Sequence, residues 1–394
     1  ISSCRSCGSV LFRNVSYFRI YGFQKDACST TLLTACCASV MSDSSTYTLN
    51  SDNRSFTVSR IARRDSSDSR EEPRSSSFPL RCGYGDVSFC DPYPDPFCRA
   101  ARQAIGAREG VNPDFLYCGN GAADVLDRLA AVLKPRKVLL TAPTFAEYER
   151  TLSGAEIRVH NLRETDGFAL TERILDEISP DLDAVYLCNP NNPTGRTAQP
   201  ELLREIVRKC TENGVKLVVD ECFNDFLTDA ERHKLQDLLE SNPGLIILRA
   251  YTKMYAVPGV RFGWCMTADA ALIEKLYHAG QPWNVSVIAQ ACAVAAANEP
   301  DWATETAKRI AEERRFLSDG LAAHGLTVFP GEANFLLFRS NDTGLHEKLA
   351  EHGIMIRNCD NYRGLSAGYY RVAVKTREAS KCLLNAIKLI IENG

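Results

Sequence analysis

The chain has 394 residues and a mass of 43.6 kDa, enough to bury a full core and to form two or three domains of roughly 100–200 residues. Its formal net charge of −3 gives no electrostatic basis for binding nucleic acid. Its apolar runs are shorter than the ~20 residues that span a bilayer. We therefore expect a soluble, cytoplasmic protein that binds neither nucleic acid nor membrane, with its scattered cysteines as reduced core thiols.

The first 85 residues differ in composition from the rest of the chain. They contain 19 serines and one lysine, whereas residues 86–394 contain 9 serines. The stretch 59–77 is charged, serine-rich and poor in aliphatic residues, which favours disorder. Cys4 and Cys7 have the spacing of half a zinc site, but the cysteines that follow supply no matching second pair, so we expect no metal.

From about residue 86 the pattern becomes regular. Apolar runs rich in β-formers alternate with helical stretches such as 124–133 and 201–210, which predicts parallel strands with crossover helices in a large domain over 86–282. After Trp283, a long helical segment through Leu317 precedes shorter strands and a closing helix at 381–391. This second part predicts a smaller α+β domain over 283–394. The expected strands are 138–140, 185–187, 216–219, 245–248, 334–338 and 370–374.

Two segments predict a site for a phosphate group. The turn 119–123 precedes an amphipathic helix, so the backbone N–H groups of Gly121 and Ala122 can face an anion at the helix N-terminus. Further along the chain, Thr252 and Arg261 can add a hydroxyl and a guanidinium to the same phosphate. A simple tight turn, and a surface ion pair of Arg261, are the alternatives that involve no ligand.

Lys253 and Asp220 are the candidate catalytic residues. A lysine amine can hold pyridoxal phosphate (PLP) as a Schiff base. Asp220 ends an apolar strand, where an unpaired carboxylate is costly, so we expect it to meet a cation such as the protonated ring nitrogen of PLP. The alternatives are a solvated lysine at a strand-to-loop junction and an aspartate that caps a helix. The two residues and the phosphate motifs together predict a PLP site.

Four further side chains are candidates for holding cofactor or substrate. Phe145 can stack on the PLP ring, and Asn192 can hydrogen-bond the phenolic oxygen. Arg357 and Arg371 lie on strand-like segments near the C-terminus and suit the carboxylate or phosphate of a small-molecule substrate. The alternatives are a core aromatic, an Asn-Pro turn and exposed strand arginines.

With these motifs in order, the chain resembles the fold-type I PLP enzymes, the class I/II aminotransferase superfamily, over about residues 86–394. Within it, the chain is most similar to the branch that holds histidinol-phosphate aminotransferase and threonine-phosphate decarboxylase. The segment 357–365 suggests the decarboxylase, as does Phe223, where related aminotransferases usually carry a tyrosine. The motifs that carry the resemblance are GNGAAD, PTFAEY, NPNNPTG, DECFNDF, YTKMYAVPGVRFGW and YYRVAVK.

The resemblance implies an α/β, PLP-dependent transferase fold: a mainly parallel, seven-stranded large domain, a smaller C-terminal α+β domain, and a homodimer. It assigns Lys253 to the Schiff base and proton transfer, Asp220 to the ring nitrogen, Asn192 to the phenolic oxygen and Phe145 to the ring face. It assigns Arg371 to the substrate carboxylate. Four positions are assigned to the cofactor phosphate: Gly121, Ala122, Thr252 and Arg261.

The expected reaction is decarboxylation of a phosphorylated amino acid such as threonine phosphate. The alternatives are an aminotransferase of the histidinol-phosphate type and an inactive relative. One departure from the superfamily bears on activity. Members of the superfamily normally begin with an arm that closes over the substrate, and residues 1–85 contain no such segment. Residues 93–96 match the segment that usually follows this arm. We interpret residues 1–85 as a misframed or misassigned start, which leaves cofactor binding intact but puts substrate closure in doubt.

Overall fold

The computed structural model describes residues 46–49, 56–59 and 93–393. The predictions of disorder after Ser59 and of no metal at Cys4 and Cys7 fall outside these residues. Two short strands, β1 (Thr46–Leu49) and β2 (Phe56–Ser59), pair antiparallel. The sequence analysis did not predict this pair, because polar and apolar residues alternate over only four residues in each segment, the shortest run that indicates a strand.

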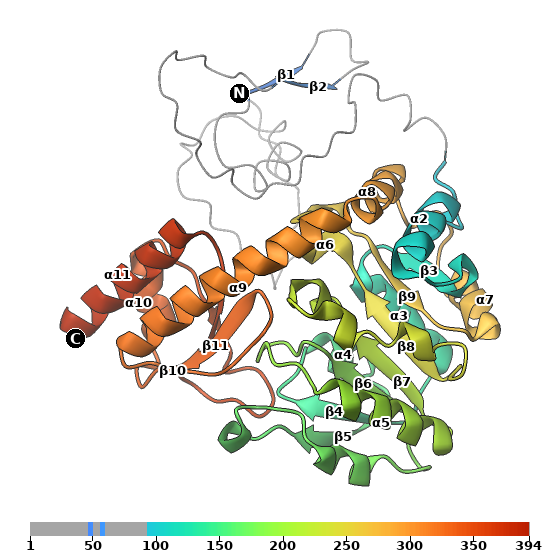
Figure 1. The fold of residues 1–394 in the computed structure, drawn as a ribbon, viewed down its shortest axis with the longest axis horizontal. Coiled ribbons are helices and arrows are strands. Elements are labelled where there is room, and N and C mark those ends of the chain that lie inside the picture. Colours follow the sequence, from blue (N-terminus) through green and yellow to red (C-terminus); the bar gives the residue numbers. More distant parts are fainter. Residues whose placement is uncertain (1–45, 50–55, 60–92, 394) are drawn as a thin grey trace, which may run out of the picture.

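A seven-stranded sheet forms the centre of the large domain (Figure 1). Its strand order is β3-β9-β8-β7-β6-β4-β5; β9 runs antiparallel to both of its neighbours, and the other adjacent pairs are parallel. The prediction of a mainly parallel, seven-stranded sheet is therefore confirmed. The strands are β3 (Leu116–Gly119), β4 (Lys137–Ala142), β5 (Glu156–Asn161), β6 (Ala184–Cys188), β7 (Lys216–Asp220), β8 (Leu245–Arg249) and β9 (Gly263–Met266).

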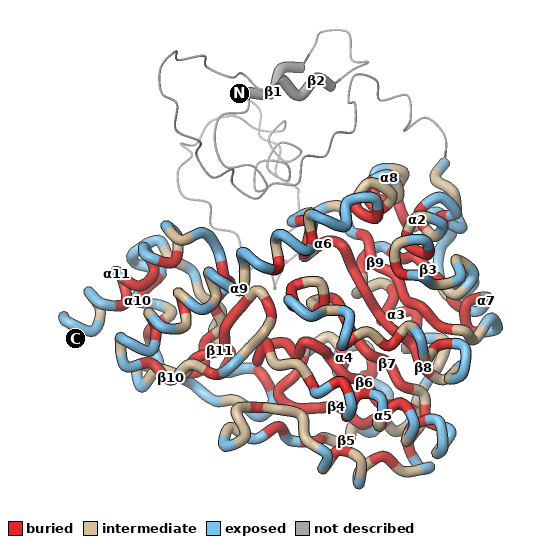
Figure 2. Tube along the Cα trace, in the orientation of Figure 1, coloured by how far each residue is buried: buried red, intermediate tan, exposed pale blue. Residues whose placement is uncertain are grey.

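Helices cover both faces of this sheet, so its strands are buried on both sides (Figure 2). Val185 and Ile247 point to the face covered by α2, α5 and α8, whereas Tyr186 and Leu248 point to the face covered by α3, α4 and α7. Burial on both faces explains why these strands appear in the sequence as continuous apolar runs. The helices are α2 (Arg99–Glu109), α3 (Ala122–Leu133), α4 (Glu147–Thr151), α5 (Pro200–Glu212), α6 (Tyr251–Met254), α7 (Ala270–His278) and α8 (Val287–Ala297).

The small domain contains a four-stranded antiparallel sheet with the order β10-β11-β13-β12. One face packs on α9, α10 and α11, and the other carries Leu337 and Tyr369 against Phe168 of the large domain. The strands and helices are β10 (Thr327–Val328), β11 (Phe335–Arg339), β12 (Arg357–Asn358), β13 (Tyr369–Ala373), α9 (Pro300–Ala323), α10 (Leu345–Glu351) and α11 (Arg377–Asn393).

The long helix expected after Trp283 is two helices, α8 and α9. They are separated at Asn298 and Glu299, and Pro300 occupies the first turn of α9, where its missing N–H costs little. The predicted boundary at 283 separates the two sheets, but α8, which follows it, packs on α2 of the large domain. Helix α9 then runs across to the small domain (Figure 1).

Eight of the nine cysteines in the described part of the chain are buried, as expected for core thiols, and Cys382 is exposed. Within residues 46–49, 56–59 and 93–393, no helix combines the length and the apolar character needed to cross a membrane.

Candidate functional site

The candidate residues gather at the carboxyl ends of the central parallel strands. The register pairs Cys188 on β6 with Asp220 on β7, and Asp220 with Leu248 on β8. The segments that follow β4, β6 and β8 carry Phe145, Asn192 and Lys253 respectively. Ligands of open α/β sheets bind outside this edge, so the topology places the predicted residues where a ligand is expected.

Asp220 is buried, with 5% of its surface exposed, and its carboxylate accepts two hydrogen bonds. The Tyr148 hydroxyl donates to Oδ2 over 2.8 Å, and the Cys222 backbone N–H donates to Oδ1 over 3.0 Å. Burial and the nearby Asp220 carboxylate raise the pKa of Tyr148, so this hydroxyl stays protonated and remains a donor. Both partners are hydrogen-bond donors, one a hydroxyl and one a backbone amide. The alternative, that Asp220 caps a helix, is wrong, because the N-cap of the helical turn that follows is Phe223.

Sequence reasoning gave Tyr148 no role, although it lies in the PTFAEY motif. Its position three residues after Phe145, one helical turn away, was the available signal. The two rings meet edge to face with centroids 5.6 Å apart. Tyr148 therefore links the buried Asp220 carboxylate to the aromatic ring expected to stack on the cofactor.

The structure brings the predicted phosphate-binding residues together. Gly121 is the N-cap of α3 with φ +85°, and a Cβ built on it would lie 2.5 Å from Nη2 of Arg261. A Cβ on Gly263 would collide with the backbone of Ala122. The guanidinium thus lies against the N-terminus of α3, where the first N–H groups have no partner within the helix. Thr252 is buried and immediately precedes Lys253 in the sequence. Thr252 and Arg261 both lie in the segment that joins β8 to β9.

Lys253 lies on the four-residue helix α6, immediately after β8, rather than at a strand-to-loop junction. Its side chain is exposed, and Nζ lies 5.9 Å from the centroid of the Phe223 ring. Phe223 packs edge to face on Phe335 of the small domain, with centroids 5.1 Å apart. The lysine therefore lies beside an aromatic pair that joins the two domains.

The two predicted substrate arginines are neighbours on the small sheet. Arg357 on β12 and Arg371 on β13 are opposite each other in the strand register. Arg371 donates a hydrogen bond to Oδ1 of Asn192 and lies 5.1 Å from the centroid of the Phe335 ring. Arg357 donates to Asn361 over 3.1 Å. Of the two, Arg371 contacts another predicted site residue, and that contact crosses between the domains.

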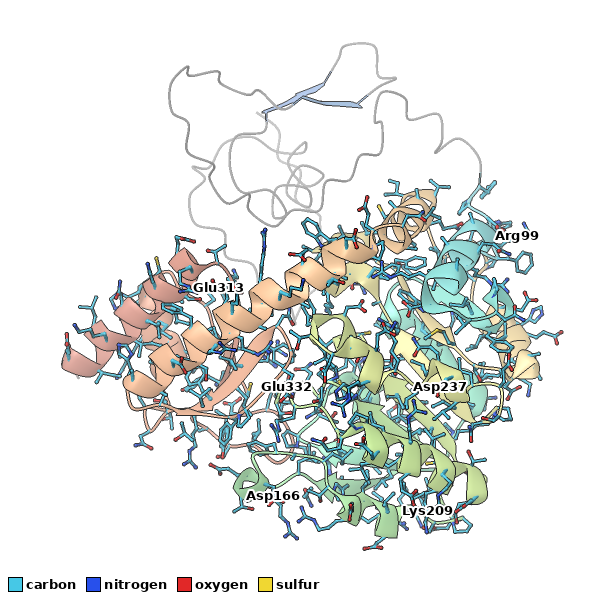
Figure 3. The ribbon with its side chains drawn as sticks, viewed as in Figure 1. Arg99, Asp166, Lys209, Asp237, Glu313 and Glu332 are labelled. Atoms are coloured by element: carbon cyan, nitrogen blue, oxygen red, sulfur yellow. The ribbon has the colours of Figure 1, made fainter. Side chains whose placement is uncertain are left out.

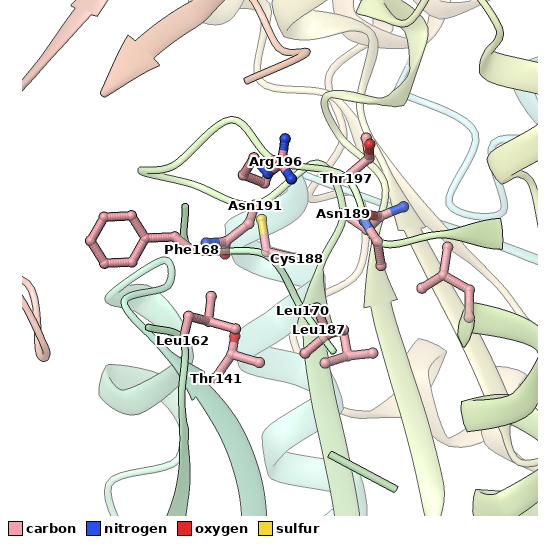
Figure 4. A pocket seen from close by; sticks show the side chains of 12 residues that line it. Thr141, Leu162, Phe168, Leu170, Leu187, Cys188, Asn189, Asn191, Arg196 and Thr197 are labelled. Atoms are coloured by element: carbon pink, nitrogen blue, oxygen red, sulfur yellow. Dashed lines mark hydrogen bonds between the residues drawn. The ribbon is translucent and has the colours of Figure 1, made fainter. Parts of the chain in front are cut away.

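Two cavities adjoin the site. A small one of about 20 Å³ lies at the start of the segment 189–198, where Figure 4 shows polar side chains of that segment beside Thr141 at the strand edge. A larger cleft of about 430 Å³ is lined by Phe145, Glu149 and the segment 360–365. Arg363 and Glu149 form an ion pair of 2.8 Å at this cleft. The cleft thus lies between the large domain and a segment of the small domain.

A buried group of charges lies next to Asp220, and the sequence did not predict it. Arg249 is 1% exposed; its Nη1 lies 2.9 Å from Oε2 of Glu109 and 3.9 Å from Oε2 of Glu221, and its Nη2 contacts Asp225. Both carboxylate oxygens of Glu221 are buried without a hydrogen-bond partner. Burial raises the pKa of Glu221 to about 8. The positive charge of Arg249 lowers this pKa, and the negative charge of Glu109 raises it again in part.

Residues 92–387 match the model of the family "Aminotransferase class I and II". The chain belongs to this family. A threonine-phosphate decarboxylase from Salmonella typhimurium is 37% identical over 304 residues, which cover 76% of this chain and 83% of that protein. A histidinol-phosphate aminotransferase from Thermococcus gammatolerans is 32% identical over 307 residues, 77% of this chain and 84% of that protein.

Among solved structures, the fold of this class I and II aminotransferase family member is similar to that of a histidinol-phosphate aminotransferase from Clostridium acetobutylicum. The TM-score is 0.73 at 27% identity, and the match covers 78% of this chain and 93% of that one. The family resemblance and the fold class inferred from the sequence are therefore both confirmed.

Replacing Glu221 with glutamine should remove a pH dependence of stability. The pKa of Glu221 is about 8 in the folded chain and 4.5 ordinarily. The folded state therefore keeps a proton that the unfolded state releases, and the wild-type protein loses stability as pH rises through this interval. We expect Glu221→Gln to match the wild type near pH 4.5 and to exceed it by about 2–4 kcal/mol near pH 9 in urea unfolding.

The matched control is Glu351→Gln, which changes an exposed carboxylate. It should follow the wild-type stability curve at every pH. An unchanged slope in Glu221→Gln would contradict the raised pKa.

Proposed function

We propose that the chain binds PLP at this site, through Lys253, and catalyses decarboxylation of a phosphorylated amino acid such as O-phosphothreonine. The observation that carries the proposal is the 37% identity to a threonine-phosphate decarboxylase over 76% of this chain. The match to the family model, over residues 92–387, includes every candidate site residue. The assembly of these residues at one sheet edge supports it.

The residues present fit PLP. The N-terminus of α3, the guanidinium of Arg261 and the missing side chain at Gly121 form an anion cradle that a Cβ would fill. Asp220 offers a buried acceptor for a protonated ring nitrogen, and Phe145 is half-buried beside Tyr148. When bound, PLP withdraws electrons from the bonds at the substrate Cα.

In the proposed reaction, each of these residues would have a separate role. Asp220 stabilises positive charge on the ring nitrogen, and Tyr148 holds that carboxylate in place. The Lys253 amine holds the cofactor and moves a proton to or from Cα. Arg371 would bind the substrate carboxylate, and its position would set how the bonds at Cα are oriented in the site.

Transamination of the histidinol-phosphate type is the second candidate. It is supported by the 32% identity to one such enzyme and by the fold similarity to another at a TM-score of 0.73. Phe223 favours the decarboxylase, because a phenyl ring brings no hydroxyl to the Lys253 side of the site. An inactive relative would keep the fold and lose the cofactor.

We also propose that the chain forms a homodimer, as the family resemblance implies. Tyr93 and Trp283 are large apolar side chains that remain 81% and 48% exposed, and their rings lie 5.1 Å apart. Phe97, which precedes α2, and Ile288, which lies on α8, are also exposed large apolar residues, and α2 and α8 pack on each other. An exposed apolar group of this kind is typical of a subunit interface.

Lys253→Ala should abolish covalent cofactor binding. After incubation with PLP and reduction with borohydride, peptide mapping should find the label on Lys253 in the wild type and no label at this position in the variant. Turnover should fall at least about 1000-fold, because the same amine transfers the proton. Lys275→Ala, which removes an exposed lysine of α7, is the control and should be labelled like the wild type. A label on another lysine would overturn the assignment.

The reaction type can be decided with PLP-loaded protein and two substrates in parallel. We expect carbon dioxide from O-phosphothreonine, at a kcat/KM at least about tenfold above that for threonine, because the phosphate contributes charge-assisted hydrogen bonds. Glutamate formation from histidinol phosphate and 2-oxoglutarate should be absent. Glutamate without carbon dioxide would make the chain an aminotransferase, and neither product would favour the inactive relative.

A further inference from the structure

We propose that Glu332 is a positioning residue that clamps the small domain onto the loop 191–197 and so keeps Arg371 in contact with Asn192. The clamp itself is a structural inference, whereas its effect on catalysis rests on the proposed function. Glu332 lies in the segment that leads into β11, far from the cofactor contacts described above. Figure 3 shows it between the small domain and the large domain.

The contacts of Glu332 are directed at the loop from both its backbone and its side chain. The backbone N–H groups of Glu332 and Ala333 donate to the Gly195 carbonyl over 2.7 and 3.3 Å. The Glu332 carboxylate accepts from the backbone N–H of Thr197 over 2.9 Å and from its hydroxyl over 3.2 Å. Its second oxygen pairs with Arg196 over 3.4 Å. Three consecutive residues of the loop are therefore held by one short segment.

The two backbones also pack without room for side chains. A Cβ on Gly331 would lie 3.0 Å from the Thr194 carbonyl oxygen, and a Cβ on Gly195 would lie 3.2 Å from the Phe335 carbonyl oxygen. Gly195 has φ +73°, a conformation that other residues rarely adopt. Such close packing fixes the register of the two segments, and the Glu332 carboxylate then locks that register.

On the small-domain side, the segment is tied to α9. Arg314 donates to the carbonyl oxygens of Glu332 and Ala333 over 2.8 and 3.0 Å. The clamp therefore transmits the position of α9, which spans both domains, to the loop. Without the carboxylate, Arg314 would still hold the segment to α9, so the small domain should stay folded while its contact with the loop weakens.

The clamp touches both chain segments that build the substrate end of the site. Asn192 lies three residues before Gly195 in the loop, and Phe335 lies three residues after Glu332 at the start of β11. The Phe335 ring lies below the Arg371 guanidinium, at 5.1 Å, and Arg371 donates to Asn192. Separation of the two segments would thus move Arg371 relative to the residues of the large domain, while the cofactor contacts there remain.

The test compares Glu332→Ala and Glu332→Gln with Glu313→Ala in the full chain. Glu313 is the matched control, because its ion pair with Arg377, at 2.8 Å, joins α9 to α11 within the small domain. Three quantities are measured: hydrogen–deuterium exchange of peptides covering 191–197 and 330–336, borohydride labelling of Lys253 with PLP, and KM and kcat for O-phosphothreonine.

In Glu332→Ala we expect exchange in both peptides to rise roughly tenfold and KM to rise by a similar factor, since the variant loses the charge-assisted hydrogen bonds of the carboxylate. Labelling of Lys253 should be unchanged. Glu332→Gln keeps an acceptor for Thr197 and should give a smaller change in both measurements, and Glu313→Ala should resemble the wild type in all three.

Wild-type exchange in Glu332→Ala would overturn the clamp. So would faster exchange across all of β11, β13 and α11, since Glu332 would then merely stabilise the small domain. If the wild type does not convert O-phosphothreonine, the proposed function fails, and the exchange of the two peptides still decides whether the clamp exists.

Discussion

The buried carboxylate of Asp220 is the constraint around which the site is arranged. A carboxylate at the end of a central strand costs several kcal/mol unless hydrogen bonds or a cation compensate its charge. Tyr148 and the Cys222 amide supply two hydrogen bonds, and a protonated cofactor ring would supply the cation. Tyr148 also donates its backbone N–H to the Phe145 carbonyl and packs edge to face on the Phe145 ring, so the residue that holds the carboxylate also contacts the aromatic ring predicted to stack on the cofactor. A PLP ring bound as proposed would thereby be held at its edge by Asp220 and at its face by Phe145.

The two domains contribute different parts of the site, and an aromatic pair joins them. The large domain holds the predicted phosphate and ring contacts, whereas the small domain contributes Arg371, which is predicted to bind the substrate carboxylate. Phe223 and Phe335 pack edge to face between them, with Lys253 near the first ring and Arg371 over the second. Each cation is attracted electrostatically to the face of its ring, in a cation–π interaction. The aromatic pair thus lies between the predicted catalytic lysine and the predicted substrate arginine.

The sequence predicted β4, β6, β7 and β8 of the large sheet, because these strands are buried on both faces and therefore appear as uninterrupted apolar runs. It did not predict β3, β5 and β9 as strands, and β5 is mostly not buried. It also singled out Asp220, which follows such a run directly, and Lys253, which lies five residues after another; their catalytic roles stay predictions. The buried charge group was beyond prediction, because Arg249 finds its partner Glu109 140 residues earlier in the chain. Helix α6 was missed for a different reason: four residues are too few to show a helical period.

The contact between Arg371 and Asn192 bears on how one family can hold both decarboxylases and aminotransferases. In the proposed function, Lys253 and Asp220 have the same roles in either reaction, so they would not decide which bond at Cα breaks. That choice depends on how the substrate carboxylate is turned, and the residue proposed to hold it belongs to the small domain, with its guanidinium fixed by a loop of the large one. Reaction type is then a property of the interdomain geometry rather than of the catalytic lysine. A change at Phe223 or in the segment that clamps the loop could alter the outcome while every cofactor contact stays the same.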